Sequence, residues 1–191
     1  MYVDALLKAE REHRLTMAEI LCLLESTEAE AALAQAADRV RSAVVGDGVH
    51  LRGLIEFSNI CRQNCFYCGL RRDNRIVHRY RLLPAEIVEL AKKAKAYGYR
   101  TVVLQSGEDS WFTVERLAPV LHSIKKLGLV ITLSIGERSL SEYRELRAAG
   151  ADRFLLRIET SDRVLYARLH PGMSFTNRLS CLRNLRQLGY E

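Results

Sequence analysis

Three cysteines lie close together in the segment FSNICRQNCFYCGLRRDN, residues 57–74. Cys61, Cys65 and Cys68 follow the spacing C-x-x-x-C-x-x-C. The thiolate form of cysteine is both a nucleophile and a ligand for soft metals. Thiols this close together therefore predict a site that holds a metal or a metal cluster.

The three thiols leave several kinds of site open. A structural zinc ion prefers four closed ligands, and here the fourth would come from His78 or a more distant residue. A disulfide would leave one cysteine unpaired, and the three could also be unrelated buried thiols. A 4Fe–4S cluster held by three thiolates keeps one iron without a protein ligand, so that iron is open to a small-molecule ligand. We favour the cluster, while zinc, a disulfide and three unrelated thiols stay open.

Composition limits the class of protein. The chain has 191 residues, enough for a domain with a core, and its 48% hydrophobic and 27% charged residues are typical of globular proteins. It contains no apolar run long enough to span a membrane, and its N-terminus does not resemble a secretory signal. The net charge of +6 comes from scattered lysines and arginines, so we expect no nucleic-acid partner. An odd number of cysteines, five, without a secretory signal predicts reduced thiols and a cytoplasmic location.

The elements that position the cysteines begin after a helical region. Residues 1–50 predict helices, because Thr16 and Glu19 have capping-box spacing and an alanine-rich segment closes on Gly46 and Gly48. We expect a helical extension over residues 1–50 and a separate region over residues 51–191.

Strand-like and helix-like segments alternate in the second region. The predicted strands cover residues 51–57, 100–105, 129–135 and 152–159, and an amphipathic helix follows each of them. This alternation predicts βαβ units and a parallel sheet. No nucleotide-binding loop of the G-x-G-x-x-G kind follows the first strand, which argues against a doubly wound fold. The alternative is a barrel of eight βα units, which takes roughly 250 residues, and the four units here make half of one.

The predicted fold class is therefore α/β: the N-terminal half of a (β/α)8 TIM-type barrel in a truncated chain, preceded by the helical extension. In this fold the cysteines follow the first strand, at the carboxyl edge of the sheet. Barrel enzymes place their chemistry at that edge.

The cysteine spacing, with an aromatic residue at Tyr67 before the last cysteine, resembles the signature of the radical S-adenosylmethionine (SAM) superfamily. Residues 51–191 further resemble the FeFe-hydrogenase maturases of the HydE type, with methylornithine synthase and biotin synthase as relatives. The segments that carry this resemblance are EFSNICRQNCFYCGLRRDN, VVLQSGED, ITLSIGE, DRFLLRIET and SFTNRLSCLRNLRQLGYE.

The resemblance implies an enzyme that cleaves SAM reductively with a 4Fe–4S cluster and helps to assemble the H-cluster of FeFe-hydrogenase. Cys61, Cys65 and Cys68 would then be both the metal ligands and the catalytic residues. It implies substrate-binding roles for Thr132 and Arg157. The cofactor-binding residues that it implies are Tyr67, Gln105, Ser106, Gly107, Glu108, Ser134, Glu159 and Arg178.

Each of these residues also has an ordinary structural explanation. The QSGED segment could instead be a loop that caps the next helix, with Asp109 facing solvent. Arg157 and Glu159 fall on one face of the predicted fourth strand, where they could form an internal ion pair that binds no ligand. Arg178 could be a surface arginine, whereas Tyr67, Thr132 and Ser134 could belong to the core. The five histidines form no pair at metal-ligand spacing, and we assign them no role.

The resemblance also implies partners. These are a small-molecule substrate, an electron donor such as ferredoxin or flavodoxin, and other hydrogenase maturases. We expect neither nucleic acid nor membrane among them. A second function that fits the motif is a methylornithine synthase or biotin synthase-like enzyme. A third is an inactive cluster-binding fragment, because about half of the barrel wall is missing from four βα units.

Overall fold

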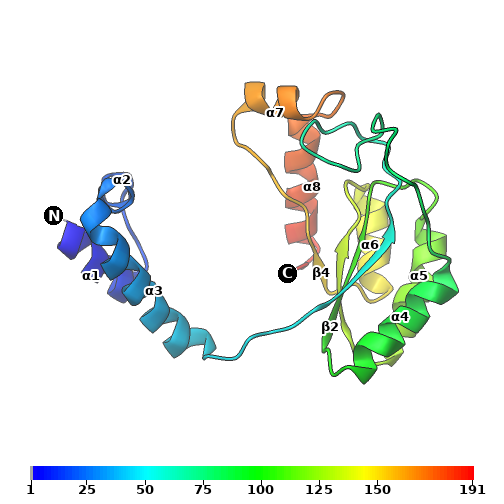
Figure 1. Cartoon of the computed structure of the whole chain (residues 1–191), viewed down its shortest axis with the longest axis horizontal. Coiled ribbons are helices and arrows are strands. Elements are labelled where there is room, and N and C mark those ends of the chain that lie inside the picture. Colours follow the sequence, from blue (N-terminus) through cyan, green and yellow to red (C-terminus); the bar gives the residue numbers. More distant parts are fainter. Residues whose placement is uncertain (1) are drawn as a thin grey trace. The chain divides into compact units, whose positions relative to one another are not determined.

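The computed structural model describes residues 2–191, which divide into two compact units (Figure 1). The first unit extends to His50, and the second runs from Leu51 to Glu191. None of the helices in the described chain is both long and apolar enough to cross a membrane.

The first unit is helical, as the sequence predicts. Thr16 caps its second helix, and Glu19 completes the predicted capping box, with the Thr16 amide donating to the Glu19 carboxylate at 2.6 Å. A small core that includes Leu6, Leu23 and Ala36 holds the unit together. Its elements are α1 (Tyr2–Glu12), α2 (Met17–Glu25), the 3-10 helix η1 (Thr27–Ala29) and α3 (Glu30–Val45).

The second unit contains a parallel sheet with the strand order β1-β2-β3-β4, so the predicted βα alternation is confirmed. The strands are β1 (Gly53–Ser58), β2 (Thr101–Ser106), β3 (Val130–Ser134) and β4 (Arg153–Phe154). The helices are α4 (Pro84–Ala96), α5 (Val114–Lys126), α6 (Leu140–Ala148), α7 (Arg163–Leu169) and α8 (Phe175–Gln187).

The two faces of this sheet differ in character because side chains alternate along each strand. One row of paired residues crosses all the strands on the buried face: Ile55, Leu104, Leu133 and Phe154. This row packs with apolar side chains of α4, α5, α6 and α8 in one core. The next row along, on the opposite face, is polar: Glu56, Gln105 and Ser134. The sheet therefore presents polar groups near its carboxyl edge on the side away from the helices.

The fourth predicted strand, residues 152–159, is mostly wrong. The strand ends at Phe154, and only the Leu155 amide continues the pairing by donating to the Leu133 carbonyl at 2.8 Å. Beyond this point the backbone turns, and Glu159 has a positive φ of 65° that no extended strand adopts. The short helix α7, which Asp162 caps, was not predicted either.

Candidate functional site

The cysteines lie in a long loop, residues 59–80, that one arginine holds together. Arg79 donates from Nη1 to the carbonyls of Asn59 at 2.6 Å and Leu70 at 3.0 Å. Its Nη2 donates to the carbonyls of Arg71 at 2.7 Å and Asn74 at 3.1 Å. The loop has little regular secondary structure, so this guanidinium satisfies carbonyls that a strand or helix would otherwise pair. The arginine thereby fixes the shape of the loop that carries the thiols.

A cavity of about 320 Å³ opens at the carboxyl edge of the sheet. Every residue predicted for the site lines this cavity except Thr132. Thr132 is buried and lies two residues before Ser134 on β3, further from the edge. The residues that line it are Cys61, Gln63, Cys65, Tyr67, Cys68, Leu70, Gln105, Ser106, Gly107, Glu108, Ser134, Gly136, Leu155, Leu156, Arg157, Glu159, Met173 and Arg178.

The three thiols share this cavity as free, half-buried cysteines. Burial raises the pKa of Cys61, and burial together with the neighbouring charges of Cys61 and Cys68 raises the pKa of Cys65 to about 11. The three cysteines therefore border one common cavity.

The thiols are nevertheless not arranged around one ion. The described His, Cys, Asp and Glu side chains include no group of three that could hold a single metal ion. The geometry therefore does not support a zinc site, whose ligands would lie about 2.3 Å from one atom. Three cysteines that line one cavity fit an iron–sulfur cluster, which takes cysteine thiolates as ligands.

Gly107 lets the chain after β2 lie directly against the cysteine loop. A Cβ at this position would meet the Ile60 carbonyl oxygen and lie 2.7 Å from the Cys61 Cβ. The Gly107 amide donates to the Ser58 carbonyl at 3.1 Å, and the next amide, that of Glu108, donates to the Cys61 sulfur at 3.4 Å. The glycine is therefore needed for packing against the cysteine loop, whatever contact it makes with a ligand.

Glu108 joins the cysteine loop to the end of β3. Its buried carboxylate accepts from Arg62 Nε at 3.1 Å and Gln63 Nε2 at 2.6 Å through Oε2. Its Oε1 accepts from the Glu137 amide at 2.9 Å. Gly136 makes this approach possible, because it has a positive φ and a Cβ there would overlap the Glu108 side chain.

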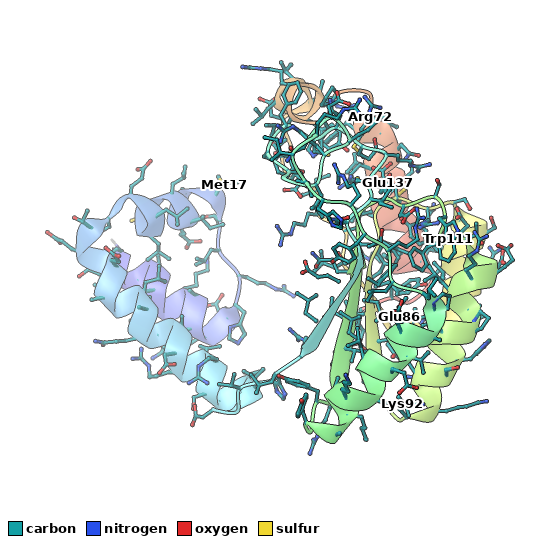
Figure 2. The ribbon with its side chains drawn as sticks, turned by 45° about the vertical axis from the view of Figure 1, so that its right-hand side comes forward. Met17, Arg72, Glu86, Lys92, Trp111 and Glu137 are labelled. Atoms are coloured by element: carbon teal, nitrogen blue, oxygen red, sulfur yellow. The ribbon has the colours of Figure 1, made fainter. Side chains whose placement is uncertain are left out.

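Arg178 is buried, so the alternative explanation of a surface arginine is wrong. Its Nε donates to Glu137 Oε1 at 2.6 Å, and its Nη1 donates to the Arg157 carbonyl at 2.5 Å. Burial is the largest influence on the pKa of Arg178 and acts to lower it, but the hydrogen bond to Glu137 and the neighbouring negative charges together outweigh burial, and the pKa is raised. The guanidinium therefore stays charged beside the cavity. In Figure 2, Glu137 lies toward the same end of this unit as Arg72, which belongs to the cysteine loop. Lys92 of α4 lies toward the other end.

The sequence did not identify Glu137, although it lies in the ITLSIGE segment. The residue is buried and also accepts from Asn177 Nδ2 at 2.6 Å. Glu108, Glu137 and Arg178 form one continuous network from the cysteine loop to α8. The local signal was an acidic residue a short distance after a buried strand.

Asp109 does not face solvent, which corrects the explanation of the QSGED segment as a simple capping loop. The residue is 2% exposed, and its carboxylate accepts from Arg81 Nε at 2.7 Å and from Ser58 Oγ at 2.7 Å. Burial by itself would raise the pKa of Asp109. The hydrogen bonds from Arg81 and Ser58 lower it by more than burial raises it, so the pKa lies below its usual value. Asp109 thus ties Ser58 at the end of β1 to Arg81, the residue directly after the cysteine loop.

Arg157 and Glu159 both line the cavity, but not for the predicted reason. They lie beyond β4, so strand alternation does not set their directions. No ion pair joins the two side chains, and an internal pair between them is therefore not supported. Glu159 instead lies close enough to Tyr67 to raise the pKa of its phenol, in addition to the larger effect of burial.

Helix α7 and the turn after it lie beside the cysteine loop (Figure 1) and contribute residues that the sequence did not identify. The Tyr67 hydroxyl lies 2.7 Å from His170 Nε2, and the buried His170 ring stacks on Tyr166. Met173 Sδ lies 3.8 Å from Cys65 Sγ. Single aromatic, histidine or methionine residues carry no sequence signal of such a contact, because tertiary packing alone brings them to the thiols.

Comparison with known proteins agrees with this geometry. A model of the radical SAM superfamily matches residues 55–191. The [FeFe] hydrogenase maturase subunit HydE of Thermotoga maritima is 52% identical over 160 residues, which cover 84% of this chain and 46% of that protein. The 3-methylornithine synthase of Methanosarcina acetivorans is 35% identical over 173 residues, 89% of this chain and 49% of that protein.

The solved structures agree on the fold. The crystal structure of methylornithine synthase (PylB) superimposes with a TM-score of 0.88 at 32% identity, over 97% of this chain and 56% of that one. The chain thus spans about half the length of the relatives that it matches.

Proposed function

Because the chain belongs to the radical SAM superfamily, we propose that Cys61, Cys65 and Cys68 hold a 4Fe–4S cluster and that the adjoining cavity binds SAM. The observation that carries this proposal is the gathering of three thiols, a buried arginine and two carboxylates in one cavity at the carboxyl edge of a parallel sheet. Such an edge is where barrel enzymes carry their active sites. The cluster, when bound, would supply the electron for reductive cleavage of the SAM sulfonium.

The protein groups around the cavity suit the charged end of SAM. Arg178 Nη2 has no hydrogen-bond partner among the described residues. A guanidinium nitrogen of this kind is a donor that binds carboxylates. Glu159 also lines the cavity and offers an acceptor for an ammonium or for ribose hydroxyls. Glu137 keeps Arg178 in place and charged, so the arginine does not have to reorganise when an anion binds.

Other residues of the cavity shield and shape it. Leu70, Leu155 and Met173 contribute apolar surface, which keeps water away from reactive groups. Gln105 and Ser134 are paired neighbours on β2 and β3 and present polar atoms at the cavity floor. We place the substrate on this polar face, with Arg157 and Thr132 as its binding residues.

We further propose that the whole protein is a HydE-type enzyme acting in assembly of the FeFe-hydrogenase H-cluster. The 52% identity to a HydE maturase supports this assignment over the 35% identity to a methylornithine synthase. Its substrate would be small, and its partners would be an electron donor such as ferredoxin or flavodoxin and other hydrogenase maturases.

A methylornithine synthase-like rearrangement is the second candidate. The close superposition on methylornithine synthase favours it, since the TM-score is 0.88. The presence of hydrogenase genes or of pyrrolysine genes beside this gene distinguishes the two candidates. A chain that binds the cluster without turnover is the third, because the described sheet forms only part of a barrel wall.

The test of cluster and SAM chemistry is direct. The protein is reconstituted anaerobically with iron and sulfide, reduced with dithionite, and assayed for 5′-deoxyadenosine. We expect product from the wild type and none from Cys65→Ala. The matched control is Cys22→Ala, which removes a half-buried thiol of the first unit and should leave iron content and product unchanged. Product from Cys65→Ala would contradict the proposed role of the thiols.

A further inference from the structure

The cysteine loop, residues 59–80, begins and ends at one narrow neck. Ser58, the last residue of β1, forms an isolated antiparallel bridge with Arg81. The Asn59 amide donates to the Tyr80 carbonyl at 3.4 Å, so the pairing extends one residue into the loop. The segment that carries the three cysteines is therefore closed at its base by backbone pairing between its two ends.

Asn59 strengthens this neck with its buried side chain. Its Nδ2 donates to the His78 carbonyl at 2.7 Å, and its Oδ1 accepts from the Tyr80 amide at 2.8 Å. A carboxamide suits this position because it offers a donor and an acceptor together. One residue at the start of the loop thereby holds the backbone on both sides of Arg79, near the end of the loop.

Arg79 returns the contact from the other end of the loop. Its guanidinium donates to the Asn59 carbonyl at 2.6 Å and to the carbonyls of Leu70, Arg71 and Asn74. In sequence, Asn59 precedes the three cysteines and the other acceptors follow them. Asn59 and Arg79 thus each hold backbone at the opposite end of the loop, and we call this pair the neck clamp.

The hydrogen bonds of the neck clamp run between protein groups, and none of them uses a cysteine sulfur. Neither Asn59 nor Arg79 lines the cavity. The clamp therefore does not compete with a ligand of the thiols and does not need one in order to form. Ordering a flexible loop costs conformational entropy, so a loop that is already ordered binds its ligand without that cost.

We propose that the neck clamp presets the cysteine loop for a metal–sulfur cluster, which makes Asn59 and Arg79 positioning residues of the cluster site. The inference rests on the proposed function, because the cluster is the ligand whose binding the clamp assists. The clamp holds the backbone on both sides of the cysteine segment, so the thiols reach the cluster from a fixed loop. Breaking the clamp lets the loop move, and the cluster is then held less tightly.

The first arm of the test uses the cluster-free protein and compares Arg79→Lys with Arg75→Lys by hydrogen exchange. Lysine keeps the charge, but its single ammonium cannot span four carbonyls as the planar guanidinium does. Arg75 is an exposed residue of the same loop and is not part of the clamp. We expect the amides of residues 59–80 to exchange at least about tenfold faster in Arg79→Lys, because two lost hydrogen bonds are enough for that factor. Arg75→Lys should exchange like the wild type.

Strands β2 and β3 show whether the effect is local. They should exchange as in the wild type in both variants, because the clamp lies outside them. Equal loop exchange in Arg79→Lys and wild type would overturn the proposal. Faster exchange in these strands as well would show that Arg79 stabilises the whole unit rather than presetting the loop, and would also overturn it.

The second arm uses the reconstituted protein and measures the rate at which iron is lost to a chelator. We expect Arg79→Lys and Asn59→Ala each to lose iron about tenfold faster than the wild type, and Arg75→Lys to lose it at the wild-type rate. Because the two side chains close one neck, the double variant should lose iron little faster than the faster single variant. Effects that multiply would show that the residues act independently, and would overturn the clamp.

The outcomes separate this inference from the proposed function. Equal rates of iron loss for wild type and Arg79→Lys would overturn the inference while leaving the proposed function intact. A wild type that takes up no iron and sulfide would instead contradict the proposed function. The hydrogen-exchange arm needs no cluster, so its result holds in either case.

Discussion

At the scale of single residues, the site depends on a buried ionic network. The Arg178 and Glu137 side chains are 8% and 9% exposed, and their nearest charged atoms are 2.6 Å apart. Removing one partner of a buried pair leaves the other charge without compensation, which costs more than the pair itself contributes. Arg178 therefore depends on Glu137 both for its position and for its burial.

This dependence predicts the effect of Glu137→Gln. The substitution keeps the shape of the side chain and removes its charge, so we expect the free energy of unfolding to fall by about 3 kcal/mol and SAM affinity to fall with it. Urea denaturation and equilibrium binding measure the two effects. The control Glu145→Gln changes an exposed residue of α6 and should alter stability by less than about 0.5 kcal/mol. Equal stabilities for the two variants would contradict the role of the network.

The contact of Gly107 with the cysteine loop gives a second residue-level prediction. A methyl group at this position would overlap backbone of that loop, so Gly107→Ala should lower the free energy of unfolding by about 2 kcal/mol and reduce iron uptake on reconstitution. Gly69→Ala is the matched control in the same loop, because nothing lies within 4 Å of a Cβ there. If Gly107→Ala loads iron like Gly69→Ala, the packing explanation is wrong.

At the scale of elements, buried side chains join segments that are far apart in sequence. Arg79 closes the cysteine loop, and Asp109 links Ser58 at the end of β1 to Arg81, which directly follows the loop. The regular elements were predictable because each carries a strong periodic pattern and clear end signals. The last part of the fourth predicted strand failed because its apolar residues fit a strand, yet the chain leaves the sheet after Leu155. Helix α7 has only 7 residues, too short for a periodic pattern to reveal.

The lowered pKa of Asp109 predicts a pH-dependent contribution to stability. A carboxyl whose pKa is lower in the folded state stabilises fully above its unfolded pKa, near 3.9. That contribution is lost as the pH falls through the lower folded pKa. At pH 7 we expect the free energy of unfolding of Asp109→Asn to be about 2 kcal/mol below that of the wild type. The loss is limited to this size because Arg81 keeps partial access to water.

Urea unfolding of both proteins from pH 7 to below pH 3 provides the measurement. The difference between wild type and Asp109→Asn should shrink as the pH falls below about 3.9. A difference that stays constant over this range would show that the charge of Asp109 contributes nothing. Comparing the two proteins at each pH cancels the titration of the other carboxyls.

At the scale of the whole molecule, all of the site residues belong to the second unit, Leu51–Glu191. Residues 51–191 without the helical unit should therefore take up iron and sulfide in the same ratio as the full chain. Iron and sulfide analysis after anaerobic reconstitution measures this ratio. Loss of uptake by a folded 51–191 protein, as judged by circular dichroism, would show that the first unit is required.

The sequence predicted the fold because it follows from local patterns, whereas most of the cavity residues were named through the resemblance to a known family. The strands end at a common edge, so residues at these ends, such as Gln105 and Ser134, meet by topology. Other contacts were not predictable, because only tertiary packing brings Glu137 to Arg178 of α8 and His170 to Tyr67.

The central claim is that three thiolates hold a cluster with one iron open to SAM. Electron paramagnetic resonance of the reconstituted, dithionite-reduced protein, recorded with and without SAM, tests it most directly. We predict a reduced-cluster signal whose g-values change when SAM is added, and no such signal from Cys65→Ala. A wild-type signal that is identical with and without SAM, or no signal at all, would contradict the account.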